Sequence, residues 1–159
     1  MADKKKRIMV ASDGSKAGTQ AVRYAAALAK RRGTELVILH AVSYKKVGYW
    51  AFIDSHFKKE MFAAGQKILE EAEGVARQYG GTVVKLLRES EKLPHVAIVD
   101  VLEELRDIWV LVLGDKGQTF EDRHAMGSTT QSVLAELSRR EVPVPLLVVP
   151  FVADVEATI

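Results

Sequence analysis

The stretch WVLVLGDKGQTFEDRHAMGST, residues 109–129, joins a short apolar run to a helix-like segment through a long polar loop. The apolar run predicts a buried strand, and strand–loop–helix units are typical of α/β proteins. Three glycines punctuate the loop: Gly114, Gly117 and Gly127. Glycines placed in this way let a backbone wrap an anion, yet the loop also carries acids that would repel one. The sequence therefore poses a choice between a phosphate cradle and an ordinary polar connection.

On both sides of this unit, apolar runs alternate with amphipathic segments. The predicted strands are 8–12, 35–42, 82–87, 109–113 and 144–149. The predicted helices run from the turn at Ser15 to Arg32, from an N-cap at Ser55 to Tyr79, over 93–106 and over 128–139. Gly33 and the pair Gly80–Gly81 end the first two helices. Strands of Val, Ile and Leu separated by helices predict one α/β domain over 1–159, with helices on both faces of a parallel sheet.

The composition is that of a globular protein. Apolar residues make up 48% and charged residues 28% of the chain, and the formal net charge is only +2. That balance gives no indication of a nucleic-acid partner or of membrane binding. The lack of cysteine excludes disulfides and thiolate chemistry and fits the reducing cytoplasm, where we expect the protein. The basic leader, 4–7, precedes no apolar signal segment, and no apolar run is long enough to insert into a membrane.

Parallel strands also predict where a ligand binds. In open sheets of this class, ligands lie beyond the carboxyl ends of the strands, where the strand order reverses. The loops after the first, second and fourth strands begin at Asp13, Val42 and Gly114. The first and last of these loops are rich in glycine and polar residues. Asp13 has two compatible interpretations, as a cap of the first helix and as a ligand contact.

The start of the last helix is the second candidate feature. Residues Gly127–Thr130 would present free backbone N–H groups, hydroxyls and the positive end of the helix dipole to an anion. The alternative is a flexible surface loop followed by an ordinary helix cap. The loop lacks the Gly-Lys-Ser/Thr of a Walker A motif, and no Gly-x-Gly-x-x-Gly follows the first strand. Neither of these two phosphate-binding fingerprints therefore accounts for it.

The spacing Gly-x2-Gly-x9-Gly-Ser, at positions 114, 117, 127 and 128, resembles the ATP-binding signature of the universal stress protein family. Four other segments are similar to segments of that family: IMVASDGSKAGTQAVRYAAALA (8–29), LVILHAV (36–42), RDIWVLVLG (106–114) and VPVPLLVVP (142–150). The resemblance covers about residues 7–150, which we take as the core of the domain. The short basic leader and the C-terminal tail lie outside it.

This resemblance implies an adenine nucleotide α-hydrolase-like sheet of strand order 3-2-1-4-5, with the reversal beside Asp13 and Gly114. It implies that ATP binds there, with other adenine nucleotides as possible ligands. Asp13 would lie near the adenine and ribose, and the backbone of Ala41 would face the adenine edge. Gly114 and Gly117 would line the ribose and phosphates. The phosphate tail would lie at Gly127, Ser128, Thr129 and Thr130.

The loop departs from the family pattern in its acids. Asp115 and Lys116 stand between the first two glycines, where the family has small, hydroxyl or basic residues, and Glu121 and Asp122 lie in mid-loop. A carboxylate within about 5 Å of a phosphate costs roughly a kcal/mol or more at intermediate dielectric. Basic side chains in the loop offset this repulsion, and a Mg²⁺ bound with the nucleotide would make the acids useful. We interpret Glu121 and Asp122 as facing solvent and leave the role of Asp115 open.

Other side chains receive structural interpretations. The four histidines share no metal-ligand spacing, so no metal site is predicted. His40 is interpreted as a hydrogen-bonded core residue, whereas His124 either contacts phosphate or faces solvent. Aromatic residues crowd the loop after the second strand: Tyr44, Tyr49, Trp50 and Phe52. They either pack on the long helix, as we expect for Phe52, or form a lid over the base or a partner surface, and Tyr49 and Trp50 are left open between the two. The Met and Phe positions of the long helix are assigned to the core, on a face that includes Phe57, Met61, Ala64 and Ile68.

The last strand has the prolines of a sheet edge, at positions 143, 145 and 150. An unprotected apolar edge invites a partner, and the family commonly dimerises through this strand, so we expect a homodimer through 144–150.

The leading interpretation is an ATP-binding regulatory module of the stress response, acting on an unidentified protein partner, with no catalytic residue assigned. One alternative is a slow ATPase or phosphotransferase, assisted by Asp13, Asp115 or His124. The other alternative is a dimeric interaction protein whose nucleotide site has decayed.

Overall fold

Parallel strands alternate with helices along the chain in the computed structural model, which describes residues 6–44, 55–117 and 125–152. The elements are β1 (Arg7–Ala11), α1 (Lys16–Arg32), β2 (Leu36–Ser43), α2 (Ser55–Arg77), β3 (Val83–Ser90), α3 (Pro94–Leu105), β4 (Ile108–Gly114), α4 (Ser128–Arg139) and β5 (Leu146–Val149). The strands pair in parallel in the order β3-β2-β1-β4-β5. The predicted class and strand order are therefore confirmed, and the order reverses between β1 and β4.

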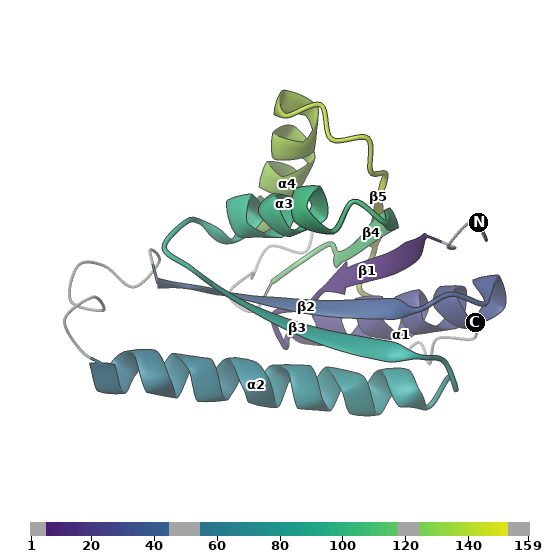
Figure 1. The fold of residues 1–159 in the computed structure, drawn as a ribbon, viewed down its shortest axis with the longest axis horizontal. Coiled ribbons are helices and arrows are strands. Elements are labelled where there is room, and N and C mark those ends of the chain that lie inside the picture. Colours follow the sequence, from purple (N-terminus) through teal and green to yellow (C-terminus); the bar gives the residue numbers. More distant parts are fainter. Residues whose placement is uncertain (1–5, 45–54, 118–124, 153–159) are drawn as a thin grey trace.

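The sheet lies between two helical layers (Figure 1), and the side chains along its central strands alternate between them. Ile8 and Val10 face the layer made by α1 and α2, whereas Met9 faces the layer made by α3 and α4. β2 alternates in the same way, with Ile38 on one side and Leu39 on the other. Each such burial contributes about 1.5–3 kcal/mol. Because both faces of the central strands are covered, these strands read as continuous apolar runs.

The helix ends follow local chemistry. Gly33 ends α1 in the left-handed region, with φ of 63°, and its N–H donates to the carbonyl of Ala29. Pro94 opens α3 at its first position, where a missing N–H costs nothing. The bounds of α4 are those predicted. Within the described ranges, no helix is both long and apolar enough to cross a membrane.

The observed bounds of two strands differ from those predicted from the sequence. β3 continues past Leu87 to Ser90, because Arg88 pairs with Ala41 and Ser90 with Ser43 although the strand is half exposed at the sheet edge. β5 begins at Leu146 rather than 144, after the two prolines. Trp109, expected in a buried run, is 38% exposed beneath the guanidinium of Arg32, which lies 3.8 Å from the ring centroid.

The buried face of α2 also differs from the prediction. The buried positions are Gly65, Leu69, Ala72 and Ala76. Met61 is only half-buried and Phe62 is 37% exposed, so the assignment of the Met and Phe positions to the core is wrong. The physical reason is the size of Gly65: a Cβ there would lie 2.9 Å from the Leu87 side chain and 3.0 Å from the His40 ring. The helix therefore approaches the sheet along its small residues, and the bulky ones lie at the margin.

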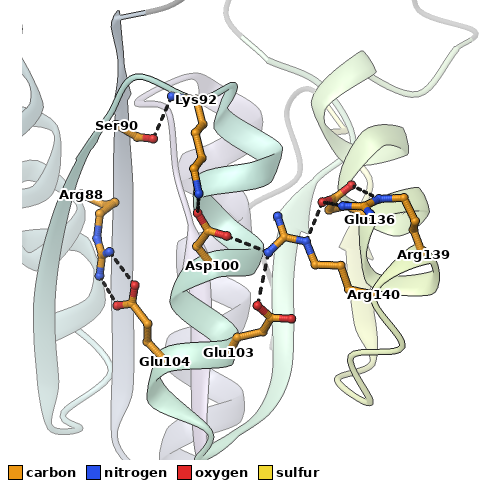
Figure 2. A network of polar contacts seen from close by, with 9 residues as sticks. All are labelled: Arg88, Ser90, Lys92, Asp100, Glu103, Glu104, Glu136, Arg139 and Arg140. Carbon is orange, nitrogen blue, oxygen red and sulfur yellow. Dashed lines mark hydrogen bonds and ion pairs between the residues drawn. The ribbon is translucent and has the colours of Figure 1, made fainter.

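A network of charged side chains joins α3 to the end of α4 (Figure 2). Arg140 donates through Nη1 to Asp100 at 2.6 Å and through Nε to Glu136 at 2.6 Å. Arg139 also binds Glu136, at 3.1 Å from Nε, and Lys92 binds the second oxygen of Asp100 at 2.8 Å. The guanidinium of Arg140 is mostly buried between the helices. These contacts fix the C-terminal end of α4 against α3.

We predict opposite effects for two Gly→Ala substitutions in α2. Gly74→Ala, where a Cβ meets nothing within 4 Å, should stabilise the protein by about 0.5–1 kcal/mol through helix propensity. Gly65→Ala gains the same propensity but overpacks the sheet, so a net loss of about 1 kcal/mol is expected. Urea unfolding measures both. Equal stabilisation by the two variants would contradict the close helix–sheet approach.

We predict an acid-dependent loss of stability from Glu136. The hydrogen bonds from Arg139 and then Arg140 lower the pKa of Glu136 from 4.5 to about 2. Because the folded-state pKa is the lower one, this stabilisation is complete above pH 4.5 and is lost as the pH falls towards 2. The melting temperature of Glu136→Gln should be below wild type at neutral pH, and the gap should close on acidification. Glu141→Gln, an exposed neighbour, is the control for removal of one charge, and a constant gap would refute the assignment.

Candidate functional site

The turn after β1 forms one wall of the site. The hydroxyl of Ser15 accepts the N–H of Gly18 at 3.0 Å and so caps α1. Asp13 instead accepts the N–H of Ser15 through Oδ1 at 3.0 Å. Asp13 therefore shapes the turn and does not cap the helix directly, which corrects one of its two interpretations. Gly14 adopts φ of 80°, which the turn requires and a side chain would disfavour.

The end of β4 lies close against α1. A Cβ on Gly114 would lie 2.9 Å from the carbonyl oxygen of Ala17, so only glycine fits without moving the helix backbone. Gly18 is equally crowded, because a Cβ there would lie 2.8 Å from Oγ of Ser12. These contacts draw the turn after β1 and the loop after β4 together. The crevice predicted at the reversal of strand order is therefore narrow at its base.

Gly117 and Gly127, the other glycines of the loop after β4, also have neighbouring atoms close to where a Cβ would lie. A Cβ on Gly117 would lie 3.1 Å from Oδ2 of Asp13, and a Cβ on Gly127 would lie 3.2 Å from the carbonyl oxygen of Asp115. The N–H of Gly127 donates to that same carbonyl at 2.6 Å. Positive φ among the described glycines occurs at Gly14, Gly33 and Gly80, outside this loop. Gly117 thus leaves room for the Asp13 carboxylate, Gly127 permits contact with the backbone of Asp115, and the N–H of Gly127 is used within the protein.

The first turn of α4 points its backbone towards the site. Ser128 to Thr130 are the first three helical residues after Gly127, so their N–H groups have no acceptor one turn back in the helix. The buried hydroxyl of Thr130 donates to the carbonyl of Gly114 at 2.8 Å. Because this bond uses the hydroxyl proton, Thr130 can donate to a ligand only through its backbone N–H. It also fastens the helix start to the end of β4.

The end of β2 presents free backbone on the side of β1. The N–H of Ser12 donates to the carbonyl of Leu39, so the polar backbone groups of residue 39 face β1. Ala41 lies two residues further on and faces the same side. β1 has ended at Ala11, which pairs with Leu39. The N–H and carbonyl of Ala41 are therefore directed over the end of β1, as a ligand edge would need.

These parts enclose a cavity of about 480 Å³. All eight residues predicted for the site line it: Asp13, Ala41, Gly114, Gly117, Gly127, Ser128, Thr129 and Thr130. Its size is within the range of small-molecule sites. One end is polar, with the N-terminus of α4 and the loop after β4. The apolar part of the lining comes from α2, α3 and the end of β2.

Sequence reasoning missed most of the apolar wall. Met61, Ala64 and Ile68 of α2 line the cavity, as do Pro94 and Ile98 of α3. Their helical spacing is the same for a cavity wall as for a core face, so periodicity could not separate the two. Lys116, which the sequence suggests only as a counter-charge to the loop acids, also lines the cavity.

His40 has the expected partner but a different setting. Its Nδ1 donates to the carbonyl of Ser12 at 2.7 Å, which fixes the proton on that nitrogen. The ring is half-buried and lines the cavity beside Gly65, so it is not a closed core residue. The alternation of Ile38, His40 and Val42 on one face of β2 was the signal that could have located it.

The remaining predictions concern the aromatic residues of the loop after β2 and the acidic residues of the loop after β4. Tyr44 is buried and its hydroxyl donates to Glu89; burial, with this hydrogen bond, raises the pKa of Tyr44 to about 12. Tyr44 therefore packs within the fold. The remaining predicted aromatics and loop side chains lie outside the described residues: Tyr49, Trp50, Phe52, Glu121, Asp122 and His124. Among the described residues, no three His, Asp or Glu side chains are placed to hold a metal ion.

A parallel sheet of this order, with helices on both faces and a cavity where the strand order reverses, defines an open doubly wound α/β protein. The family model described as "Universal stress protein family" matches residues 5–150, and the chain belongs to that family.

Individual relatives are similar over most of their length. Universal stress protein MJ0531 of Methanocaldococcus jannaschii is 27% identical over 136 residues, 81% of this chain and 75% of its own. The structure of universal stress protein UspA from Lactobacillus plantarum has a TM-score of 0.73 at 23% identity, covering 92% of this chain and 98% of its own. The universal stress protein from Archaeoglobus fulgidus in complex with dAMP has a TM-score of 0.62 at 22% identity, covering 90% and 96%.

Proposed function

We propose that this protein binds an adenine nucleotide in the 480 Å³ cavity and acts as a nucleotide-dependent regulatory module, with ATP as the expected ligand. The observation that carries the proposal is the convergence of eight residues, chosen from sequence, on one cavity at the point where the strand order reverses. They come from four separate stretches of the chain. A pocket that formed merely from loop packing would have no reason to gather them.

The polar end suits phosphate. The N–H groups of Ser128, Thr129 and Thr130 open α4, and the helix dipole adds positive potential at the same place. Lys116 supplies a nearby positive charge from the loop. Hydrogen bonds from backbone N–H groups to a charged acceptor are each worth about 1.5–3 kcal/mol. This end of the cavity would therefore hold the phosphate part of the ligand.

The other end suits a purine nucleoside. The backbone of Ala41 can both donate and accept beyond the end of β1, as the edge of an adenine ring requires. Asp13 also lines the cavity, with Oδ2 close to Gly117, and we expect a ribose hydroxyl to reach its carboxylate. Met61, Ile68 and Ile98 offer apolar surface to the faces of the base. The complex of the Archaeoglobus fulgidus relative with dAMP supports this choice of ligand class.

The groups at the site favour binding over catalysis. Most contacts offered to the ligand are backbone groups and hydroxyls. Asp13 accepts the N–H of Ser15, and Asp115, in the loop after β4, accepts the N–H of Phe151. Among the described residues no three His, Asp or Glu side chains are grouped to hold a metal ion, so we expect a Mg²⁺ to be carried mainly by the phosphates of the nucleotide itself. A slow ATPase is the alternative that sustained phosphate release, lost in Asp13→Asn, would establish.

The nucleotide prediction is tested by calorimetric titration with adenosine, AMP, ADP, ATP and cyclic AMP. We expect the phosphorylated ligands to bind more tightly than adenosine. Ser128→Pro should weaken AMP and ATP about tenfold or more and leave adenosine unchanged, because it removes one N–H at a helix position that tolerates proline. The backbone of Gly127, with φ −58° and ψ 146°, already suits a residue before proline.

Ser128→Ala is the matched control, because it removes the hydroxyl and keeps the N–H. Its affinity should stay within a few-fold of wild type. If no ligand gives heat or a thermal shift at millimolar concentration, the site has decayed and the nucleotide function is wrong. If Ser128→Pro binds ATP like wild type, the phosphate does not lie at α4.

We propose in addition that β5 mediates a homodimer. β5 pairs only with β4 among the described strands. The carbonyls of residues 145 and 149 accept the N–H groups of Leu111 in β4 and of Asp115 just after it, so the backbone of Leu146 and Val148 faces outwards. Such an edge can pair with a second copy.

Light scattering at micromolar concentration should give the mass of two chains. Val148→Pro, which removes an outward donor only, should give one chain, whereas Val148→Thr should remain a dimer; a monomeric wild type would rule this edge out.

A further inference from the structure

Asp115 makes three separate contacts just after β4. Its N–H donates to the carbonyl of Val149, at 3.1 Å, and its own carbonyl accepts the N–H of Gly127, at 2.6 Å. Its carboxylate accepts the N–H of Phe151 through Oδ1, at 3.0 Å. One residue therefore joins the end of β4, the start of α4 and the chain beyond β5. The side chain is directed to the C-terminal segment, and Asp115 is not among the residues that line the cavity.

The chain beyond β5 is held by side chains and not by a strand. β5 ends at Val149, and Pro150 has no N–H to donate. The next two N–H groups are both accepted: that of Phe151 by Asp115 and that of Val152 by Oε1 of Gln20, at 3.3 Å. Gln20 belongs to α1 and Asp115 to the loop after β4. The short segment 151–152 is thus held by α1 and by the loop after β4, two of the parts that border the cavity.

The position of Asp115 sets the start of α4. Asp115 accepts the N–H of Gly127 through its backbone carbonyl and the N–H of Phe151 through its carboxylate. The fit at Gly127 is close, since a Cβ there would lie 3.2 Å from that carbonyl oxygen and 3.4 Å from Cα of Lys116. A shift of residue 115 would therefore shift Gly127, and with it the N–H groups of Ser128 to Thr130. An anion held by those groups is sensitive to small errors in their direction.

We propose that Asp115 is a positioning residue of the nucleotide site and that Phe151, through its N–H, is part of the support of that site. This rests on the proposed function. Two effects of the Asp115 carboxylate on a bound phosphate have opposite signs. Its charge repels the phosphate, whereas its acceptor oxygen holds the donors in place. Asparagine removes the charge and keeps an acceptor oxygen, so the two effects can be separated by substitution.

The first test compares Asp115→Ala and Asp115→Asn by calorimetric titration with AMP and with adenosine. Asp115→Ala should weaken AMP binding tenfold or more and leave adenosine within twofold. Asp115→Asn should bind AMP as tightly as wild type, or more tightly. If Asp115→Ala binds AMP at least as tightly as wild type, the carboxylate only repels phosphate and the proposal is overturned.

The partner of Asp115 gives the second test. Phe151→Pro removes the N–H, and Phe151→Ala keeps it while removing the same aromatic ring. The proline variant should lose AMP affinity as Asp115→Ala does, beyond any loss in the alanine variant. Combining Asp115→Ala with Phe151→Pro should cause no further loss, because both break one contact. Additive losses would overturn the proposal.

A third measurement is independent of any nucleotide. Amide hydrogen exchange of Gly127, followed by NMR, reports its bond to the carbonyl of Asp115. Exchange should be at least tenfold faster in Asp115→Ala and Phe151→Pro than in wild type and Asp115→Asn. If wild type binds no AMP but this pattern holds, the proposed function fails while the positioning role of Asp115 stands. Unchanged exchange in every variant would overturn the positioning role itself.

Discussion

The contact of Gly114 with its neighbours is the constraint on which the rest of the site depends. On one side, its missing Cβ lets the carbonyl of Ala17 come within 2.9 Å of where that atom would be. On the other, its carbonyl accepts the hydroxyl of Thr130. α1, β4 and α4 therefore meet at one residue. The crevice between the turn after β1 and the loop after β4 has its width set by this junction, and the N-terminus of α4 is directed over it.

The framework around the junction is held by two different kinds of interaction. Apolar side chains on both faces of the sheet supply the bulk of the folding free energy and fix the strand order. Charged side chains act at the rim, where Arg140 ties α4 to Asp100 of α3. Packing of the apolar layers sets the order and register of the strands, and so the approximate positions of their ends. The polar contacts then set the orientation of a single helix, which is the finer requirement for binding an anion.

The site itself is made largely of backbone groups. Such groups are held in place by secondary structure, so they bind with little loss of side-chain entropy. The same fact makes the site dependent on loop geometry, because a backbone donor cannot be replaced by a neighbouring rotamer. Contacts remote from the ligand, such as those of Asp115 with Gly127 and Phe151, become part of the binding machinery for that reason.

What the sequence determined by itself was local. Runs of Val and Ile, the stop at Gly33 and the bounds of α4 follow from propensity and periodicity, and the family resemblance that the glycine spacing carries pointed to eight of the residues that line the cavity. Tertiary structure alone decided the direction of the Asp115 carboxylate, the use of the Gly127 N–H inside the loop, the exposure of His40 to the cavity and the face of α2 that lies on the sheet. Each of these depends on atoms brought together from distant parts of the chain, such as Gly114 with Ala17 and Gly65 with Leu87. A residue's pattern along the sequence carries no record of such distances, because they are set only when parallel strands align and the helices pack across them.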